Sequence, residues 1–267
     1  MKSDVAVVSV KDLHTRLGIA GSLDYPMASV NKPLKEWKME IDDAPIFRYI
    51  YRNFRPRRHL EFGTWQGTGS LYCLEECDAT VWTINLLQGE GRTDGTWVYC
   101  SALSVPSGRF ALSRLFSRAK KKSSRVPFWA KREELSRGLF SYQTDSLGFI
   151  GKHYLEAGFG HRVCQIYCDS RQWDVSNYPP AFFDTALIDG GHSQDAVTSD
   201  THKACQLVRA GGLIMWHDFC PQMEVYDHCP STRGVMSAIK TDWDWLCTQM
   251  TDLFWINPSW ILLGVKR

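Results

Sequence analysis

Short apolar segments alternate with helix-like segments along most of this chain, and this alternation constrains the fold more than any other feature. Strand-like runs occur at RHLEF, ATVWTIN, RVCQIYCDS, FFDTALIDGG and GGLIMWHDF, and helix-like segments lie between them. Such alternation is typical of a mostly parallel sheet covered by helices on both faces. The last segment, LFWINPSWILLGVKR, reads as two strands joined through Asn257-Pro258. It predicts an antiparallel strand at the edge of a seven-stranded sheet.

The 267 residues are enough for one large domain with a sizeable core. Apolar residues within 33–56 recur at helical spacing and predict an amphipathic helix that ends before Pro56. We expect an N-terminal extension over residues 1–43 and the main domain over residues 44–267. Within that domain, residues 91–150 break the strand–helix rhythm and are expected to form a basic insertion or lid.

The basic character of the insertion is concentrated in one block. Residues 114–132 carry eight basic and no acidic side chains. Such a block attracts an anionic partner, which includes nucleic acid, anionic lipid or an acidic substrate. A solvated loop is the alternative, and both interpretations stay open.

Several protein classes are disfavoured by the sequence. No run of about 18 apolar residues occurs, so we expect no transmembrane segment. The N-terminal residues lack the apolar segment and cleavage site of a signal peptide. The nine cysteines include no CxxC pair, which argues against a zinc ribbon. Together these features favour a reducing, cytoplasmic location.

The segment HLEFGTWQGTGS, residues 59–70, places three glycines directly after a strand-like run. The spacing of Gly63, Gly67 and Gly69 does not match the dinucleotide-binding G-x-G-x-x-G pattern, and no P-loop lysine follows. Glu61 would repel a phosphate but would suit a ligand that bears an ammonium group. S-adenosylmethionine has such a group and no phosphate. A simple tight turn is the alternative.

Ionisable or polar side chains also follow three later strand-like runs. In open α/β sheets, ligands bind at the carboxyl ends of the strands. Charged groups gathered there cost desolvation free energy unless they bind something. The side chains in question are Asp169, Ser170, Asp189, His192, His217 and Asp218. They predict a binding site at this edge, although Asp169 also suits a surface helix cap.

These motifs, in this order, resemble class I S-adenosylmethionine-dependent methyltransferases. The variants LIDGGHS and RAGGLIMWHDF resemble the "type 24" group, which is akin to macrolide-sugar O-methyltransferases and cephalosporin-tailoring proteins. The resemblance covers about residues 44–90 and 150–265, and it implies a Rossmann-like, doubly wound fold. It also implies S-adenosylmethionine as the cofactor, held by Glu61, Gly63, Thr64, Trp65, Gly67, Thr68, Asn85, Asp169, Ser170 and Asp189. Asn85 stands where the family usually has an acid for the ribose hydroxyls, and a neutral amide is a weaker acceptor.

Methyl transfer to a hydroxyl oxygen requires that the hydroxyl lose its proton, either to a base or with the help of a metal. The resemblance implies that Asp189, His217 and Asp218 hold Mg²⁺ or another divalent metal. Metal-free catalysis would use His192 or His217 as the base beside Asp218. A third interpretation gives the histidines structural hydrogen bonds only.

We therefore expect an S-adenosylmethionine-dependent methyltransferase that acts on an oxygen of a small molecule, sugar or glycan. One alternative is a nucleic-acid methyltransferase that uses the basic insertion to bind phosphates. The other is a non-enzymatic binding module with the same fold. Assembly into a homo-oligomer is left open.

Overall fold

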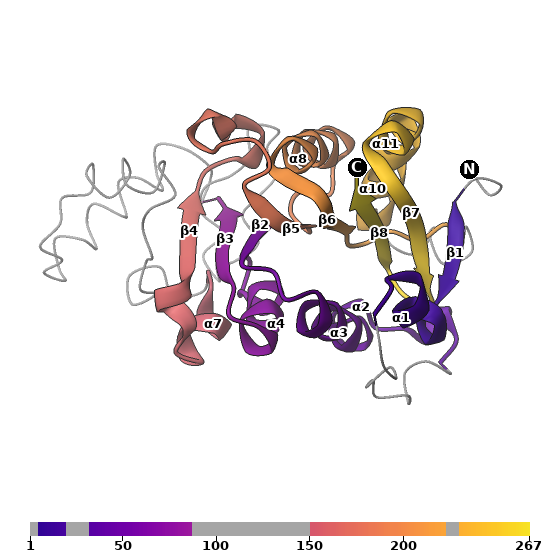
Figure 1. Cartoon of the computed structure of the whole chain (residues 1–267), viewed down its shortest axis with the longest axis horizontal. Coiled ribbons are helices and arrows are strands. Elements are labelled where there is room, and N and C mark those ends of the chain that lie inside the picture. Colours follow the sequence, from indigo (N-terminus) through magenta and orange to yellow (C-terminus); the bar gives the residue numbers. More distant parts are fainter. Residues whose placement is uncertain (1–4, 20–31, 87–149, 223–229) are drawn as a thin grey trace, which may run out of the picture.

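The computed structural model describes residues 5–19, 32–86, 150–222 and 230–267, which together form an eight-stranded sheet with helices on both faces (Figure 1). The strand order across the sheet is β1-β7-β8-β6-β5-β2-β3-β4. The strands are β1 (Ala6–Ser9), β2 (Arg58–Phe62), β3 (Thr80–Asn85), β4 (Val163–Tyr167), β5 (Phe183–Ile188), β6 (Val208–Trp216), β7 (Met250–Asn257) and β8 (Ile261–Lys266).

The sheet corrects two details of the expected topology. β8 runs antiparallel to both of its neighbours, β6 and β7, so the antiparallel strand is internal and not at an edge. β7 therefore runs parallel to β6 and lies on the far side of β8. The helices that connect β6 to β7 carry the chain past the position that β8 then fills. An eighth strand, β1, pairs in parallel with β7 and forms the edge. The α/β class and the mostly parallel sheet are confirmed.

The central strands are buried on both faces, which explains their continuous apolar sequences. Every residue of β2 from His59 onward is buried, as is every residue of β6 from Gly212 to Trp216. Parallel strands covered by helices on both sides require this pattern. The polar residues that follow these strands therefore emerge directly from an apolar interior.

The helices are divided between the two faces of the sheet (Figure 1). α8, α10 and α11 cover one face, whereas α3, α4 and α7 cover the other. None of the helices in the described ranges has the length and apolar content to cross a bilayer. The helices are α1 (Leu13–Arg16), α2 (Met39–Asp42), α3 (Ala44–Phe54), α4 (Thr68–Glu76), α7 (Lys152–Glu156), α8 (Gln194–Leu207), α10 (Pro230–Thr241) and α11 (Trp243–Gln249).

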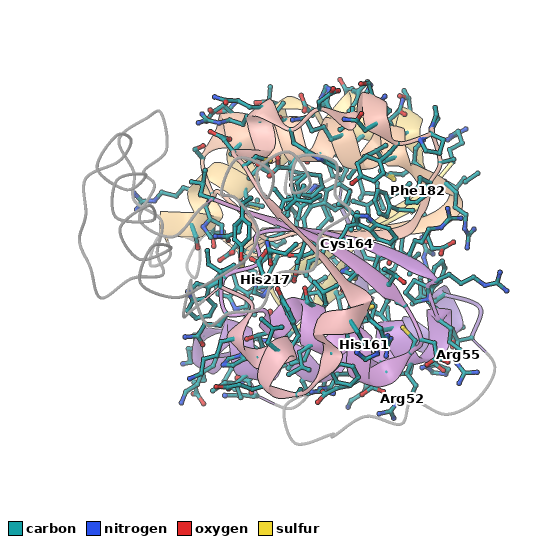
Figure 2. All side chains as sticks on the ribbon, turned by 90° about the vertical axis from the view of Figure 1, so that its left-hand side faces the viewer. Arg52, Arg55, His161, Cys164, Phe182 and His217 are labelled. Atoms are coloured by element: carbon teal, nitrogen blue, oxygen red, sulfur yellow. The ribbon has the colours of Figure 1, made fainter. Side chains whose placement is uncertain are left out.

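The helix expected over residues 33–56 is interrupted. A 3-10 turn at Leu34–Glu36 and the short α2 precede α3, which begins after Asp43 and has a proline in its first turn. Proline is favoured there because its missing N–H would have no partner in any case. Figure 2 shows Arg52 and Arg55, near the end of α3, at the rim of the molecule, whereas His217 lies in its interior.

Candidate active site

The glycine turn joins the end of β2 to the start of α4 at the carboxyl edge of the sheet. Gly63 and Gly67 adopt left-handed backbone conformations, with φ of 100° and 82°. A Cβ on Gly63 would overlap the backbone oxygen of Asp189, and one on Gly67 would overlap the ring of Tyr154. The glycines are therefore required for packing within the chain, which the sequence alone did not indicate.

Asn85, at the end of β3, holds this turn in place. Its Oδ1 accepts a hydrogen bond from the backbone N–H of Trp65 at 3.1 Å, and its Nδ2 donates to the carbonyl of Leu86. Trp65 is in the left-handed region, with φ of 44°. This contact fixes the turn at a position where the backbone conformation is costly. The proposed contact of Asn85 with a ribose stays a prediction.

Two threonines of the turn are tied to neighbouring elements. The hydroxyl of Thr64 lies 2.7 Å from that of Thr83 and accepts from Gln165 Nε2 at 2.9 Å. The hydroxyl of Thr68 lies 2.8 Å from Nδ1 of His153 in α7. The turn is thus anchored on both of its sides.

Glu61 lies beneath the turn and is only 1 % exposed. Its Oε2 accepts hydrogen bonds from the hydroxyls of Ser70 and of Thr83, the latter at 2.6 Å. Burial raises the pKa of Glu61 to about 8, although the two hydroxyls favour the ionised form. These contacts are internal to the chain, and the expected contact of Glu61 with a ligand amine stays a prediction.

Asp169 and Ser170 follow β4, and Asp169 caps the 3-10 turn Ser170–Gln172 as the alternative interpretation expected. Its carboxylate accepts from the backbone N–H of Arg171 at 3.0 Å and pairs with the Arg171 guanidinium at 2.7 Å. Lys203 donates to the backbone carbonyls of Ser170 and Arg171. The segment is therefore held beside α8, and its predicted contact with adenine stays a prediction.

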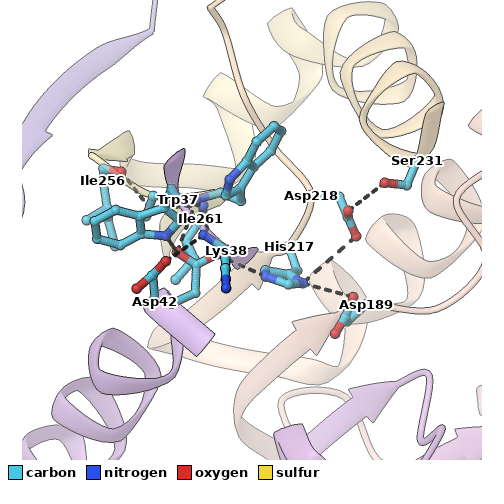
Figure 3. Close-up of polar contacts among 12 residues, drawn as sticks. Trp37, Lys38, Asp42, Asp189, His217, Asp218, Ser231, Ile256 and Ile261 are labelled. Carbon is cyan, nitrogen blue, oxygen red and sulfur yellow. Dashed lines mark hydrogen bonds and ion pairs between the residues drawn. The ribbon is translucent and has the colours of Figure 1, made fainter. Parts of the chain in front are cut away.

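The structure gathers Asp189, His192, His217 and Asp218 into one cluster at the ends of β5 and β6. Figure 3 shows three of them, Asp189, His217 and Asp218. His192 Nε2 lies 2.8 Å from Asp218 Oδ2 and 3.9 Å from Asp189 Oδ1. Ser231, at the start of α10, donates its hydroxyl to the other oxygen of Asp218 at 2.6 Å. The side chains that follow β5 and β6 thus lie together, whereas the roles expected for them stay predictions.

His217 is held between two carboxylates. Its Nδ1 lies 3.2 Å from Asp189 Oδ1, and its Nε2 lies 3.1 Å from Oδ2 of Asp43. Because both acceptors are carboxylates, each ring nitrogen donates a proton. The edge-on ring of Phe47 packs against the imidazole with centroids 5.5 Å apart.

Asp43 is the site residue that the sequence reasoning missed. It stands directly before α3 and is completely buried. An aspartate at that position is ordinarily a helix cap, so its sequence context gave no reason to place it at the site. Only the folded chain brings it beside a residue 174 positions away.

The charges in the cluster are mutually compensating. The carboxylates around the two imidazoles outweigh the effect of burial and raise the pKa of His217 well above its usual value and that of His192 to about 10. The imidazoles in turn hold the pKa of Asp189 and of Asp218 below the usual range despite burial. Two imidazolium groups thus balance the charges of Asp189 and Asp218 when no other cation is near.

Three of these residues lie close enough together that they could hold a metal ion. One ligand atom each from Asp189, His192 and Asp218 lies within 4.8 Å of the others. This set differs from the predicted Asp189, His217 and Asp218, because both nitrogens of His217 face carboxylates and His192 is the histidine that joins the group.

The basic insertion cannot be related to this site. All of residues 91–150 except Ile150 lie outside the described residues, and so does the block 114–132. The expectation of an anionic partner, and the nucleic-acid alternative that depends on it, therefore stay predictions.

The comparisons with known proteins place the fold and the family. No curated protein matches the sequence. A putative caffeoyl-CoA O-methyltransferase from Staphylococcus aureus is similar in structure, with 14% identity, 96% of each chain covered and a TM-score of 0.50. An O-methyltransferase from Bacillus cereus, solved with SAH, has 14% identity and a TM-score of 0.48, with 90% of this chain and 86% of that chain covered. At this identity, the first of them shows the shared fold alone.

The family assignment comes from a model described as a methyltransferase domain, Methyltransf_24, which matches residues 60–219. The matched range contains the glycine turn and all four members of the cluster, but not Asp43. It confirms the expected enzyme class, an S-adenosylmethionine-dependent methyltransferase. The chain belongs to the Methyltransf_24 family of methyltransferases.

Proposed function

We propose that this methyltransferase uses S-adenosylmethionine to methylate an oxygen atom of a small molecule, sugar or glycan. The observation that carries the proposal is the position of the cluster: Asp189 forms part of it and also packs its backbone against Gly63 of the glycine turn. Groups that can handle a hydroxyl proton thus lie directly beside the turn that we assign to the cofactor. Such proximity is the main requirement of a direct transfer between two bound molecules.

The glycine turn is suited to a cofactor without phosphate groups. No lysine or arginine occurs between residues 59 and 70, so the segment has no side-chain cation to pair with a phosphate. We assign the methionine part of the cofactor to Gly63, Thr64, Trp65, Gly67, Thr68 and Glu61, with Asp189 beside it. We assign the nucleoside part to Asn85, Asp169 and Ser170. When bound, the cofactor supplies a methyl group on a positively charged sulfur.

We assign a divalent metal to Asp189, His192 and Asp218. Two carboxylate oxygens and one imidazole nitrogen suit Mn²⁺, Zn²⁺ or Fe²⁺ better than Mg²⁺, which prefers oxygen ligands. Such an ion lowers the pKa of a hydroxyl bound to it. The role of Ser231 is to orient Asp218 through its 2.6 Å hydrogen bond.

The arrangement also indicates how the proton of an acceptor hydroxyl would be handled. In the structure His192 is a cation between two carboxylates, with a pKa of about 10, so it holds a proton at neutral pH. A metal ion at the same carboxylates would replace that positive charge and leave the imidazole neutral. With an ion held by Asp189, His192 and Asp218, these side chains would serve as ligands and not as proton acceptors, and the ion would assist deprotonation by lowering the pKa of the hydroxyl.

Isothermal titration of the full-length protein with S-adenosylhomocysteine and with S-adenosylmethionine tests the cofactor assignment. Incubation with hydroxylated small molecules and sugars, followed by mass spectrometry for an added methyl group, tests the reaction in the presence of Mn²⁺ or Mg²⁺. We expect binding of both cofactor forms and a methylated oxygen in the product. Absence of heat at millimolar cofactor would contradict the assignment and favour a binding module. Methylation of oligonucleotides in place of small molecules would favour the nucleic-acid alternative.

A further inference from the structure

Asp43 uses its carboxylate in an unusual way for a residue that precedes a helix. At such a position an aspartate ordinarily accepts a hydrogen bond from the first backbone N–H groups of its own helix. Asp43 makes no such hydrogen bond to the described residues of α3. Its side chain turns instead toward the carboxyl edge of the sheet, where it is completely buried.

The carboxylate of Asp43 is bound by three separate parts of the chain. Trp37 Nε1 donates to Oδ1 at 2.6 Å, and the backbone N–H of Trp260 donates at 3.3 Å to each oxygen. His217 Nε2 donates to Oδ2 at 3.1 Å. A buried carboxylate needs such a set of donors to remain charged. Trp37 and the turn between β7 and β8 therefore fix Asp43, and Asp43 fixes His217.

His217 transmits this constraint to the cluster. Its second nitrogen, Nδ1, donates to Asp189 Oδ1 at 3.2 Å, so a carboxylate holds the imidazole ring at each end. Figure 3 shows His217 between Asp189 and the segment that carries Trp37. Asp189 also belongs to the group of three residues that could hold a metal. The orientation of Asp189 is thus linked to a residue in the N-terminal part of the chain.

We propose that Asp43 is a positioning residue, which acts through His217 to hold Asp189 in the orientation that binds a divalent cation together with His192 and Asp218. The proposal rests on the metal assignment made above and extends it beyond residues 60–219, the range of the family match. It gives the segment around residues 37–43 a functional role. Residues that orient a metal ligand typically affect metal affinity by about 10–100-fold when they are changed.

The first test compares two adjacent buried aspartates. Asp43→Asn keeps the shape of the side chain but removes its charge. Asp42→Asn is the matched control, because Asp42 is also buried but accepts from Lys32 Nζ at 2.6 Å and from the backbone N–H of Lys38 at 2.5 Å. The dissociation constant for Mn²⁺ is measured by titration calorimetry on the full-length protein without cofactor, after circular dichroism has confirmed the fold.

We expect Asp43→Asn to weaken Mn²⁺ binding by about 10–100-fold and Asp42→Asn to leave it within about twofold. A folded Asp43→Asn protein with the Mn²⁺ affinity of the unmodified protein would overturn the proposal. Equal losses in both variants would overturn it as well, because they would indicate general destabilisation of the segment. Where Asp43→Asn does not fold, Trp37→Phe takes its place. It removes one donor to Asp43, and an unchanged Mn²⁺ affinity would then count against the proposal.

The second test requires no metal. Long-range ¹H–¹⁵N spectra of the histidine side chains report which nitrogens carry protons, and His217→Gln identifies the signals of His217. We expect signals of two protonated nitrogens in the unmodified protein and in Asp42→Asn, and a changed Nε2 signal in Asp43→Asn. An unchanged His217 spectrum in Asp43→Asn would overturn the positioning role. If the unmodified protein binds no Mn²⁺, the metal assignment fails, whereas this spectrum still decides whether Asp43 positions His217.

Discussion

Gly63 and Asp189 lie so close together that a Cβ on the glycine would overlap the backbone oxygen of the aspartate. Gly63 also has a φ of 100°, which side-chain-bearing residues rarely adopt. Asp189, which directly follows β5, is the first acid of the cluster. The glycine turn and the acidic cluster are therefore in direct backbone contact.

Gly63→Ala tests this junction. The substitution combines a strained φ with a backbone overlap, and we expect the free energy of unfolding to fall by about 3 kcal/mol or more. Gly158→Ala is the matched control: Gly158 has a φ of 83°, but a Cβ there meets no atom within 4 Å. Gly158→Ala should lower the free energy of unfolding by only about 1 kcal/mol, which is the cost of the left-handed backbone conformation. Urea unfolding measures both values. Equal losses of unfolding free energy in the two variants would show that the overlap with Asp189 does not affect stability.

The alternation of apolar and helical segments was sufficient to predict most of the fold. Strands such as β5 and β6 are short, apolar and followed by glycine or charged residues, so both their type and their ends were readable. β1 was missed, because its four residues at an edge bury little and leave only a weak pattern. The internal position of β8 was missed too, since a hairpin in the sequence does not indicate which of its strands faces the sheet.

Part of the candidate site was also predictable, because the ends of the strands could be located in the sequence. The positions of Asp189, His192 and Asp218 after strands β5 and β6 placed them at one edge of the sheet, where the structure brings them together. The roles of the two histidines were not predictable, because they depend on which nitrogen faces which carboxylate. Asp43 was beyond sequence reasoning, because its contact with His217 depends on how α3 packs against the sheet.

His192→Gln tests the choice between the two histidines as the metal ligand. Because changes outside the ligand set already cost about 10–100-fold, loss of the ligand itself should weaken Mn²⁺ binding by about 100-fold or more. His202→Gln is the control, since His202 pairs with Asp242 at 3.0 Å on the surface, outside the cluster. Titration calorimetry measures both. Unchanged Mn²⁺ affinity in His192→Gln would return His217 to consideration as the ligand.

Glu61→Gln tests the burial of the glutamate beneath the glycine turn. Burial raises the pKa of Glu61 from 4.5 to about 8, so the folded protein binds a proton that the unfolded chain releases in this range. The contribution of Glu61 to the free energy of unfolding therefore has its full value below pH 4.5. It is lost as the pH rises to about 8. Glutamine does not titrate, so the variant should lack this part of the decline. Urea unfolding across that range measures it, with Glu156→Gln, a change at an exposed glutamate, as the control.

Asp169→Ala tests the assignment of the nucleoside part of the cofactor. If the Asp169 carboxylate meets a donor of the ligand in a buried setting, its loss should weaken S-adenosylhomocysteine binding by about 1–3 kcal/mol. Asp174→Ala is a close control, because Asp174 caps the next 3-10 turn with the same kind of contact, to the backbone N–H of Ser176. Both variants lose a contact to a backbone N–H, and Asp169→Ala also loses the ion pair with Arg171. Equal affinities in the two variants would assign Asp169 to the pairing with Arg171 alone and would leave the nucleoside without this contact.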